Sequence, residues 1–543
     1  MLGVLVVQCI IAFLCCNVLY YLFFRTRTSL PLPPGPKGWP IIGNLLQLPK
    51  DGMLNHEYWL TLRERHGDIY SLSVFGNHMI VFHDRDAVHD IFEKQSSVTS
   101  ARPPFLIRNQ PFGLQNYFAF KTYDSSYRRH RKMVHRYYGT KTAVSAYHGL
   151  QDIESMRLLV RIRNEPKNLV EHIKRDIAAV QLQATHGYTT EPKGNDPLVK
   201  LTCELVNEAA TFAVPLSFLV DIFPPFKWLP EFVPGLGFKA KARRAAITTK
   251  AAAEIPFDFV RKRMESGDYR TSYVSLALNR LESTRKDEPL NPGAGDEETD
   301  EDIIKWTSAI MLAGGTDTQT GILASFMIAM IQFPEVQRKA QEEIARVIGE
   351  KRLPTFSDRD DLPYLDAVAK EAIRFFNVVP MGLAHVADQD IHYRGYLIPK
   401  GAYLLPSVWW FCHNPDVYKD PMTFKPERFL GPVSEPDPAD HVFGFGRRAC
   451  PGRYLTDSTM YITIARFLAA FKIRAALDKQ GRPIPVELGR IPNGVVHFPG
   501  EFAYEIESRS GKMDQLIESF EKHDDLGEGD WRLLEGEVIK KFY

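Results

Sequence analysis

Cys450 is the residue of this sequence whose surroundings most clearly suggest chemistry. It lies in the segment Phe443-Gly444-Phe445-Gly446-Arg447-Arg448-Ala449-Cys450-Pro451-Gly452, directly before a helical pattern that begins near Tyr454. Three glycines and a proline around one cysteine predict a tight loop whose backbone can approach a bulky planar ligand. A helix N-terminus and backbone N–H groups near the sulfur would stabilise a thiolate. The segment therefore favours a functional cysteine over a buried structural one.

A second candidate lies in the apolar segment 303–331, which contains Ala313-Gly314-Gly315-Thr316-Asp317-Thr318 at its middle. Glycines weaken a helix interior, and a threonine hydroxyl can donate a hydrogen bond to a preceding carbonyl and open a groove. An acid beside an alcohol at such a bend can pass protons to a bound oxygen species. An ordinary kinked core helix explains the same pattern, so this motif alone leaves the choice open.

Three further polar patterns are weak when each is taken alone. Glu371 and Arg374 are spaced i,i+3, as on many solvated helices, and Arg428 lies in the short segment Pro-Glu-Arg-Phe at 426–429. A basic run follows Tyr127 over residues 128–136. A solvated helix face explains this run better than nucleic-acid binding, because it carries no stacked aromatic repeats.

The cysteine segment resembles the F-x-x-G-x-R-x-C-x-G signature of the cytochrome P450 family of haem-thiolate monooxygenases. Every fixed position is present, as Phe443, Gly446, Arg448, Cys450 and Gly452. The resemblance implies that Cys450 is the proximal ligand of a haem b iron, and that its electron donation favours O–O cleavage. It also implies that Arg448 pairs with a haem propionate, and that Phe443 packs near the sulfur and tunes its donation.

The helix motif matches the same family's distal-helix pattern. By this resemblance Asp317 and Thr318 serve oxygen protonation. Gln319 departs from the pattern, because the family usually has threonine or serine there. The departure bears on the details of the proton relay rather than on the acid–alcohol pair.

The remaining motifs follow in the family's order, and the resemblance spans roughly residues 31–510. Glu371, Arg374 and Arg428 match its E-x-x-R and P-E-R-F elements, which implies a salt-bridged structural cluster that holds the haem-ligand loop. Such a cluster is vulnerable once one partner is removed, because the others are left unpaired.

Three more residues are implied to contact the haem propionates. Arg131 fits the family's W-x-x-x-R element, whereas Tyr127 replaces its tryptophan and can supply a hydroxyl donor instead of an indole N–H. His385 aligns with a basic or histidine contact, although a plain strand histidine explains it nearly as well. The other basic residues of 128–136 would suit docking of an acidic electron donor.

The substrate pocket is predicted only by analogy with the family, from mainly apolar segments that favour a lipophilic or aromatic substrate. Several of the phenylalanines in these segments could equally belong to the core. The candidate substrate residues are Phe112, Phe118, Phe120, Ala313, Val379 and Val495.

The predicted activity is haem-dependent insertion of one atom of O2 into a lipophilic small molecule, in a setting that resembles fungal secondary metabolism. No segment resembles a flavin- or nicotinamide-binding domain, so electrons are expected from NADPH through a separate membrane-bound cytochrome P450 reductase. One alternative is a thiolate-haem isomerase or dehydratase without O2 activation. It is disfavoured by Asp317 and Thr318, because such an enzyme needs no oxygen-protonation relay. A non-catalytic haem sensor is the other alternative.

The elements that must position these residues are mostly helical by periodicity. Helices are predicted within 143–187, 303–331, 335–348 and 365–376, and two short strands around a Gly-Asn turn within 74–81. Loops are predicted at 190–197 and 284–301, strands and turns over 391–430, and a short helical tail after Arg509. The fold class is mainly α with small β-sheets, the cytochrome P450 fold.

Residues 2–24 are almost continuously apolar, long enough for a transmembrane anchor, and Arg25 and Arg27 follow them. Positive charge on that side predicts a single-pass anchor in the endoplasmic reticulum membrane, in contact with lipid, with the rest of the chain in the cytoplasm. The chain then divides into a basic, proline-rich hinge at 25–44, a haem domain at 45–509 and a charged tail at 510–543.

Composition excludes several other classes. The 543 residues carry a formal net charge of +1, so no global field attracts nucleic acid. Three of the six cysteines lie in the apolar run and the others are isolated, which supports neither a disulfide framework nor a cysteine-rich zinc site.

Overall fold

The computed structural model describes residues 30–49, 53–104, 113–191, 196–212, 228–229, 238–287, 298–523 and 529–534. These residues form two compact units. Unit 1 contains the described part of the chain up to Pro103 together with Met381–Ser407, and unit 2 contains the rest. The predicted anchor at 2–24 lies outside the described residues. Within the described parts, none of the helices combines the length and apolar character that crossing a bilayer requires.

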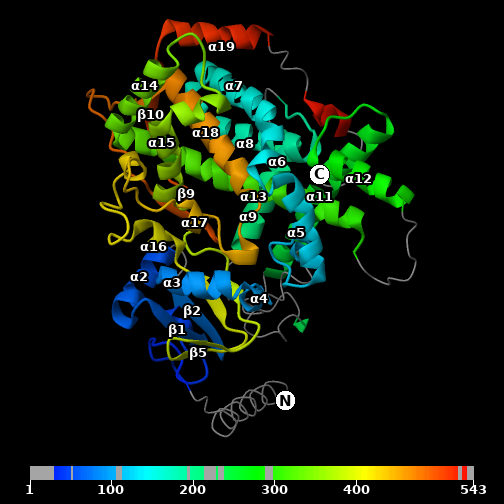
Figure 1. The fold of residues 1–543 in the computed structure, drawn as a ribbon, viewed down its shortest axis with the longest axis vertical. Coiled ribbons are helices and arrows are strands. Elements are labelled where there is room, and N and C mark those ends of the chain that lie inside the picture. Colours follow the sequence, from blue (N-terminus) through cyan, green and yellow to red (C-terminus); the bar gives the residue numbers. More distant parts are fainter. Residues whose placement is uncertain are drawn as a thin grey trace, which may run out of the picture. The chain divides into compact units, whose positions relative to one another are not determined.

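Unit 1 is built on a four-stranded sheet in the order β1-β2-β6-β3 (Figure 1). β1 pairs antiparallel with β2, β2 pairs parallel with β6, and β6 pairs antiparallel with β3. β4 and β5 form a separate hairpin. The elements are η1 (Leu45–Gln47), α2 (Asn55–His66), β1 (Ile69–Val74), β2 (Asn77–Phe82), α3 (Arg85–Val88), η2 (His89–Lys94), α4 (Ser96–Thr99), β3 (His385–Val386), β4 (Ile391–Tyr393), β5 (Tyr396–Ile398) and β6 (Tyr403–Pro406).

The proline-rich segment before η1 packs along β1. Ser71 donates its N–H to the carbonyl of Pro34 at 2.7 Å and its hydroxyl to that of Pro33 at 2.6 Å. Asn44 closes the segment, because its N–H donates to Ser73 O at 2.6 Å and its Oδ1 accepts from Ser73 N–H at 2.8 Å. A Cβ atom at Gly43 would lie 1.9 Å from Ser73 O, so only glycine allows this approach.

Unit 2 is mainly helical, with short strands at its margin. Its helices before the haem-ligand segment are η3 (Leu114–Asn116), α5 (Ser125–Tyr138), α6 (Lys141–Val144), η4 (Ser145–Tyr147), α7 (His148–Asn164), η5 (Pro166–Asn168), α8 (Leu169–His186), α9 (Pro197–Phe212), α11 (Phe238–Glu265), α12 (Tyr273–Asp287), α13 (Asp300–Gln332), α14 (Pro334–Val347), η7 (Phe356–Asp361), α15 (Pro363–Phe375) and α16 (Val408–His413). The later elements are η8 (Pro426–Phe429), α17 (Ala439–Val442), η9 (Gly446–Arg448), α18 (Arg453–Ala470), β7 (Phe471–Ala475), β8 (Arg490–Asn493), β9 (Val496–Pro499), β10 (Tyr504–Ser508), α19 (Gly511–His523) and η10 (Asp530–Leu534).

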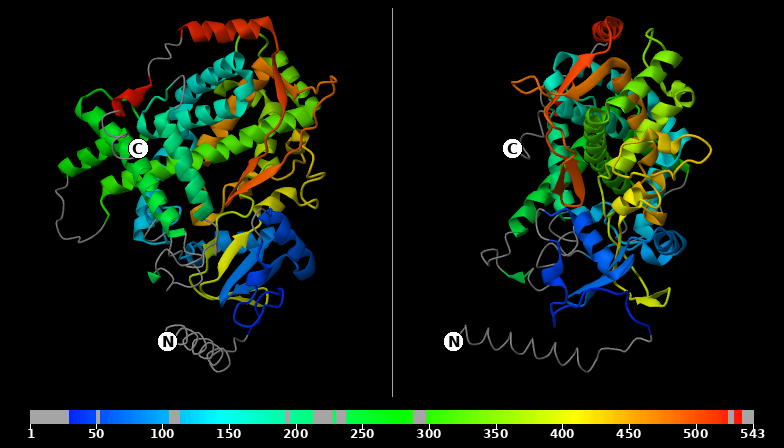
Figure 2. Two further views of the ribbon diagram at one scale, coloured as in Figure 1. Left: turned by 180° about the vertical axis from the view of Figure 1, so that it is seen from behind. Right: turned by 90° about the vertical axis from the view of Figure 1, so that its left-hand side faces the viewer.

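The 33-residue helix α13 runs through the interior of unit 2 (Figures 1 and 2). Thr299 caps its N-terminus by accepting the N–H of Asp302, and three acidic residues occupy its first turn, where the helix dipole favours negative charge. The rest of the helix is apolar on nearly every face, which matches burial on all sides rather than on one stripe. α7, α8, α15 and α18 share the largest hydrophobic core with it.

Most of the helices and strands expected from periodicity are present. The two strands near 74–81 pair through a turn at Phe75 and Gly76, both at positive φ, whereas Asn77 already belongs to β2. The expected loop at 284–301 is wrong at both ends, because α12 continues to Asp287 and α13 begins at Asp300. The expected strands over 391–430 form as β4, β5 and β6, but α16 and η8 were not predicted within that range.

Candidate active site

The loop that carries Cys450 is a tight reversal between η9 and α18. Gly444 and Gly446 adopt positive φ angles of 75° and 53°, which explains the glycines by local geometry. The N–H of Cys450 donates to the carbonyl of Phe443 at 2.6 Å and closes the loop. α18 begins at Arg453, three residues later, so the cysteine precedes a helix N-terminus as the sequence predicted.

Cys450 is a free, partly exposed thiol. The surrounding protein raises the pKa of the thiol by desolvation, while a hydrogen bond from the Gly452 N–H and the charges of Arg131 and Arg453 act in the opposite direction. The balance raises the pKa, so the loop by itself disfavours the thiolate, in contrast to the stabilisation expected from the sequence, and a bound cation such as ferric iron would supply the missing stabilisation.

The middle of α13 exposes one narrow strip although the helix around it is buried. Gly314 is exposed and Thr318, one turn later, is partly exposed, while Ala313, Thr316 and Asp317 are buried. A Cβ atom at Gly314 would meet no other heavy atom within 4 Å. Thr318 donates its hydroxyl to Gly314 O at 2.9 Å, the backward hydrogen bond that the motif predicted. The strip thus offers open space beside a hydroxyl group.

Met311 joins this helix to the cysteine loop. Its terminal methyl group would lie 3.8 Å from a Cβ atom placed on Gly452, and the Cys450 sulfur would lie at the same distance from that atom. The first half of α13 and the loop are therefore neighbours in unit 2. A free cysteine next to a helix with an open strip fits a planar group such as haem, held through the sulfur.

Asp317, next to the open strip in sequence, is itself buried, at 4% exposure. Burial raises the pKa of its carboxyl group, and the positive charge of Lys174 on α8 opposes that increase. At Gly315, a Cβ atom would come within 2.5 Å of the side-chain amide of Gln181 on α8. The second glycine of the motif thus permits close packing of α8, a role that the sequence pattern did not reveal.

Arg448 is held by backbone carbonyl groups and by an aromatic ring. Its guanidinium donates to the carbonyls of Phe118 at 3.0 Å and Lys121 at 2.7 Å, and it lies 3.9 Å from the centre of the Tyr127 ring. The Tyr127 hydroxyl donates to the carbonyl of Arg447 at 2.5 Å. Tyr127 therefore supports this edge of the loop through stacking and through its hydroxyl, in the position where the family has tryptophan.

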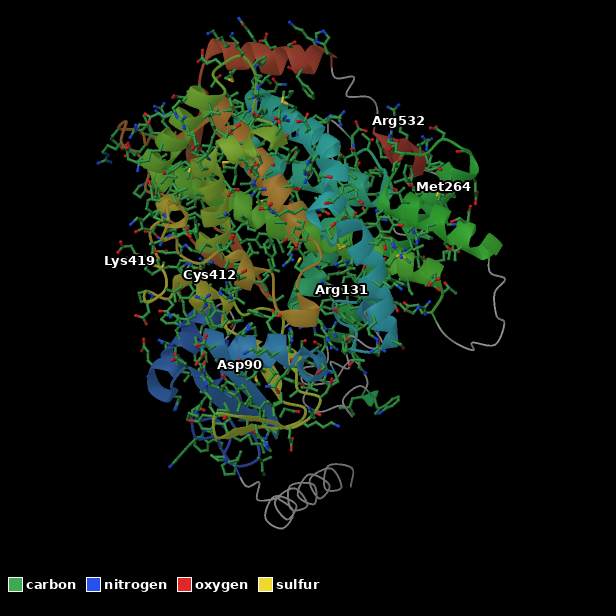
Figure 3. All side chains as sticks on the ribbon, in the orientation of Figure 1. Asp90, Arg131, Met264, Cys412, Lys419 and Arg532 are labelled. Carbon is green, nitrogen blue, oxygen red and sulfur yellow. The ribbon has the colours of Figure 1, made fainter. Side chains whose placement is uncertain are left out.

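Arg131 lies one turn after Tyr127 on α5 and is partly exposed (labelled in Figure 3). Its positive charge lowers the pKa of Cys450, which puts it within electrostatic reach of the sulfur. Phe443 is partly buried and packs against the largest core. These two residues and Arg448 all belong to unit 2, together with Cys450.

His385 belongs to unit 1. Its Nδ1 lies 2.7 Å from the carbonyl of Thr99, and its ring packs beside Phe92. These contacts match the plain strand histidine that the sequence left as an alternative. The propionate contact stays a prediction.

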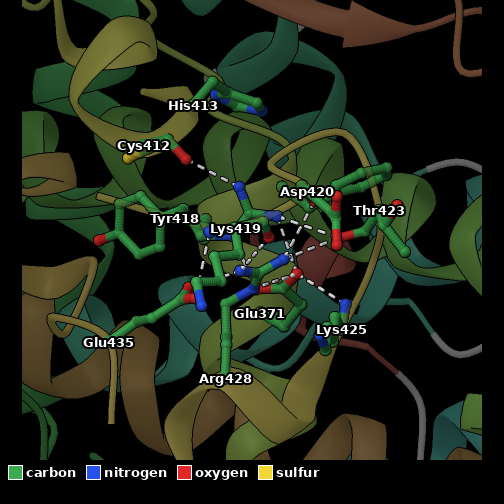
Figure 4. A network of polar contacts seen from close by, with 12 residues as sticks. Glu371, Cys412, His413, Tyr418, Lys419, Asp420, Thr423, Lys425, Arg428 and Glu435 are labelled. Atoms are coloured by element: carbon green, nitrogen blue, oxygen red, sulfur yellow. Dashed lines mark hydrogen bonds and ion pairs between the residues drawn. The ribbon is translucent and has the colours of Figure 1, made fainter. Parts of the chain in front are cut away.

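The predicted cluster of Glu371, Arg374 and Arg428 forms within unit 2 (Figure 4). Arg374 donates to both carboxylate oxygens of Glu371, at 2.7 and 2.8 Å, and Arg428 donates to one of them at 3.2 Å. Most of the remaining donors reach backbone carbonyls, including that of Cys412 from Arg374 at 2.7 Å, and Arg428 also donates to the carboxylate of Glu435. All three charged side chains have no exposed surface, so the cluster is fully desolvated.

The predicted substrate residues separate into four groups. Phe112 lies outside the described residues. Phe118 is a buried core residue whose ring packs with those of Tyr127 and His130, as the core alternative predicted. Phe120 and Ala313 belong to a small apolar cluster with Leu114 and Ala309.

Val379 and Val495 are partly exposed and lie next to segments that approach α13. The neighbouring Val378 would lie 3.1 Å from a Cβ atom on Gly321 of α13, and its carbonyl accepts the N–H of His497 on β9 at 2.8 Å. The turn between β8 and β9 therefore lies near α13, the helix that carries the open strip.

Sequence reasoning missed Met311, Gln181 and Lys174, which border the site. A methionine, a glutamine and a lysine on helical patterns carry no local signal of their own, because only packing of α8 and the loop against α13 brings them there.

Comparisons with known proteins agree with this arrangement. A family model described as Cytochrome P450 matches residues 33–497. The chain is 41% identical to cytochrome P450 monooxygenase CLM2 of Gibberella zeae, over 98% of this chain and 99% of that protein. It is 42% identical to multifunctional cytochrome P450 monooxygenase af510 of Aspergillus fumigatus, over 92% and 93%, and 35% identical to O-methylsterigmatocystin oxidoreductase of Aspergillus flavus, over 91% of each. The chain therefore belongs to the cytochrome P450 family, and it is a haem-thiolate monooxygenase that acts on a small molecule with O2 and a redox partner.

Proposed function

We propose that this monooxygenase oxidises a lipophilic small molecule of secondary metabolism, while anchored by residues 2–24 in the endoplasmic reticulum membrane. The observation that supports this function at the level of single residues is the exposed strip formed by Gly314 and Thr318. This strip lies on an otherwise buried helix, next to the Cys450 loop. Haem bound through Cys450 would supply the binding and reductive activation of O2.

The protein's own groups supply orientation and protons. The Thr318 hydroxyl is fixed by its bond to Gly314 O, so its oxygen faces the open strip and can accept and pass on a proton there. Asp317 is the nearest acid in sequence, and burial raises the pKa of its carboxyl group, which favours a proton-carrying state. Arg448 and Arg131 supply positive charge for the propionates.

The redox partner is proposed to be a membrane-bound NADPH–cytochrome P450 reductase. α5 exposes Arg128, Lys132, His135 and Arg136 on one helix of unit 2, which suits an acidic partner surface. A common membrane would hold the enzyme and its reductase in one plane, which raises their effective concentration. The apolar candidates Val379 and Val495, beside α13, support a lipophilic substrate.

Reduced-plus-CO difference spectroscopy tests the ligand assignment. Cys450→Ala should lose the absorbance band of thiolate-ligated haem, whereas Cys203→Ala, which removes a thiol from α9, should keep it. An unchanged band in Cys450→Ala contradicts the assignment.

Thr318→Ala tests the proton role separately. With reductase and NADPH, this variant should consume NADPH with a smaller fraction converted to product, and bind haem as before. Thr318→Ser keeps the hydroxyl and should keep most of the coupling. Full coupling in Thr318→Ala would overturn the role of the hydroxyl.

A further inference from the structure

Glu298 lies just before α13, in a segment where the sequence shows no motif. Its carboxylate nevertheless contacts three side chains. Glu298 Oε2 accepts a hydrogen bond from Ser126 Oγ at 2.6 Å, and it lies 2.9 Å from His130 Nε2 and 3.4 Å from Lys121 Nζ. Ser126 and His130 belong to α5, and Lys121 belongs to the segment before it. One carboxylate thus connects the start of α13 to residues 121–130.

The carboxylate is held in its ionised form. Burial raises the pKa of Glu298, but the hydrogen bonds from His130 and Ser126 and the charge of Lys121 outweigh this effect and leave the pKa well below its usual value. Burial also lowers the pKa of His130, so its imidazole is neutral near pH 7. Hydrogen bonds to an ionised group are stronger than hydrogen bonds between neutral groups, so Glu298 holds the start of α13 tightly to residues 121–130.

Arg448 donates a hydrogen bond to the same segment, residues 121–127, that Glu298 anchors. Arg448 donates to the carbonyl of Lys121 at 2.7 Å, and the side chain of the same Lys121 reaches Glu298. On α5, Tyr127 follows Ser126 directly and donates its hydroxyl to Arg447 O. Two short connections therefore lead from Glu298 to Arg447 and Arg448, which lie three and two residues before Cys450.

We infer that Glu298 is a positioning residue for the haem edge: it fixes residues 121–127 to the start of α13 and thereby holds the Arg448 guanidinium in place. This inference rests on the proposed contact between Arg448 and a haem propionate. Loss of the carboxylate should let residues 121–127 shift, so that Arg448 holds the propionate less well and haem leaves faster, while Cys450 still binds the iron.

A neighbouring ion pair offers a matched control. Arg129 donates to Asp300 at 2.8 Å, and this pair also joins α5 to the start of α13. Its side chains are 37% and 48% exposed, so it is a surface pair whose loss should cost little. A cavity of about 480 Å³ lies beside both pairs and gives water access to them.

The experiment compares haem release from the full-length holoproteins of wild type, Glu298→Gln and Asp300→Asn, measured by transfer of haem to an excess of apomyoglobin. Glu298→Gln should release haem at least about tenfold faster, and Asp300→Asn should stay within about twofold of wild type. The reduced-plus-CO band of freshly prepared Glu298→Gln should keep the thiolate position. Equal release from the two variants would overturn the inference.

Arg448→Lys separates this inference from the assignment on which it rests. Faster release from Arg448→Lys supports the haem-edge role of Arg448, and an unchanged rate contradicts that role. If Arg448→Lys accelerates release and Glu298→Gln does not, only the positioning role of Glu298 fails.

The double variant distinguishes positioning from general stability. If Glu298 acts through Arg448, Glu298→Gln should accelerate release little further in the Arg448→Lys background. Independent, multiplicative effects of the two changes would show that Glu298 stabilises the protein by another route, and would overturn the inference.

Discussion

At the scale of single residues, Glu371 should be the least replaceable carboxylate in unit 2. Glu371→Gln leaves the buried Arg374 guanidinium without its counter-ion and leaves Arg428 with Glu435 alone, and removing one partner of a buried charge cluster typically costs about 3–5 kcal/mol. We expect a sharp loss of folded, haem-loaded protein, measured as haem content per polypeptide and as the midpoint of urea unfolding.

Glu427, next to Arg428 in sequence, provides the control. It is 35% exposed and pairs with Lys339. Glu427→Gln should change stability by no more than about 1 kcal/mol. Similar effects from the two substitutions would contradict the role of Glu371 as the centre of the cluster.

Asp176 on α8 should make stability depend on pH. Burial, with a smaller contribution from Glu154, raises the pKa of its carboxyl group to about 7, although Arg161 and Arg466 oppose the increase. Between the ordinary value of 3.8 and about 7, the native state keeps a proton that the unfolded state has released. Stability must therefore fall as pH rises through this window, by at most about 1.4 kcal/mol per pH unit.

Asp176→Asn removes this titration. Thermal unfolding of the variant between about pH 5.5 and 7.5 should show a flatter pH dependence than wild type. The wild-type slope in this window includes every other titrating group, so the difference between the two proteins is the relevant quantity. A difference of zero, or one of opposite sign, would contradict a protonated Asp176.

Short motifs in the sequence predict roles for Cys450, Thr318 and Glu371; the ion pairs of Glu371 are present, and the roles of Cys450 and Thr318 stay predictions. The sequence could not predict how Arg448 is held, since its partners are backbone carbonyls, one of them 330 positions away, and any residue type can supply a carbonyl. The burial of Asp317 was equally hidden, because it depends on the packing of α8 against α13.

At the scale of elements, the C-terminal residues pack onto unit 2 at two places. Met513 and Ile517 of α19 are buried in the largest core. Farther on, Asp530 of η10 accepts the N–H of Thr189 at 2.7 Å and a hydrogen bond from Arg270 at 2.6 Å. Leu534 is buried in the core cluster that contains Phe257 of α11, and Figure 3 labels Arg532 near Met264 there.

These contacts predict that η10 stabilises two connections, the one after α8 and the one between α11 and α12. Asp530→Ala should cost about 1–3 kcal/mol, because it leaves the Thr189 N–H without its carboxylate acceptor and Arg270 with only the carbonyl of Gly187. Hydrogen exchange should increase at residues 187–191 and 268–272.

Lys512→Ala is the control for a substitution elsewhere in the same tail, since Lys512 is 68% exposed and pairs only at the surface with Glu350. It should leave exchange at both connections unchanged. Equal protection in Asp530→Ala and wild type would show that η10 does not hold them.

Periodicity predicted the long helices well, since apolar faces at a spacing of 3.6 residues are a local property. It failed where burial on all sides or a short length hides the pattern. α16 has only six residues and lies in a segment rich in tryptophan and proline, and the last turn of α12 consists of polar residues that resemble a loop.

At the scale of the whole molecule, the family and its haem chemistry could be predicted because several motifs occur in one order. The division into two units could not be predicted, because Met381–Ser407 joins residues far earlier in the chain through the parallel pairing of β2 with β6. A sequence-distant parallel pair leaves no local signal, whereas a hairpin such as β1–β2 does.

The hydrogen bonds between β1 and the segment before it predict where the folded domain begins. A variant without residues 1–29 should leave the membrane fraction, because it lacks the apolar run at 2–24, and it should keep the thermal midpoint of haem loss. A variant without residues 1–44 should melt at a lower temperature, because Ser71 and Ser73 lose the partners that Pro33, Pro34 and Asn44 supply. Each lost hydrogen bond should cost about 0.5–1.5 kcal/mol, so the two truncations should differ by several kcal/mol. Equal melting of both would show that residues 31–44 act only as a spacer, and retention of the shorter truncation in the membrane pellet would show that the anchor is not confined to residues 2–24.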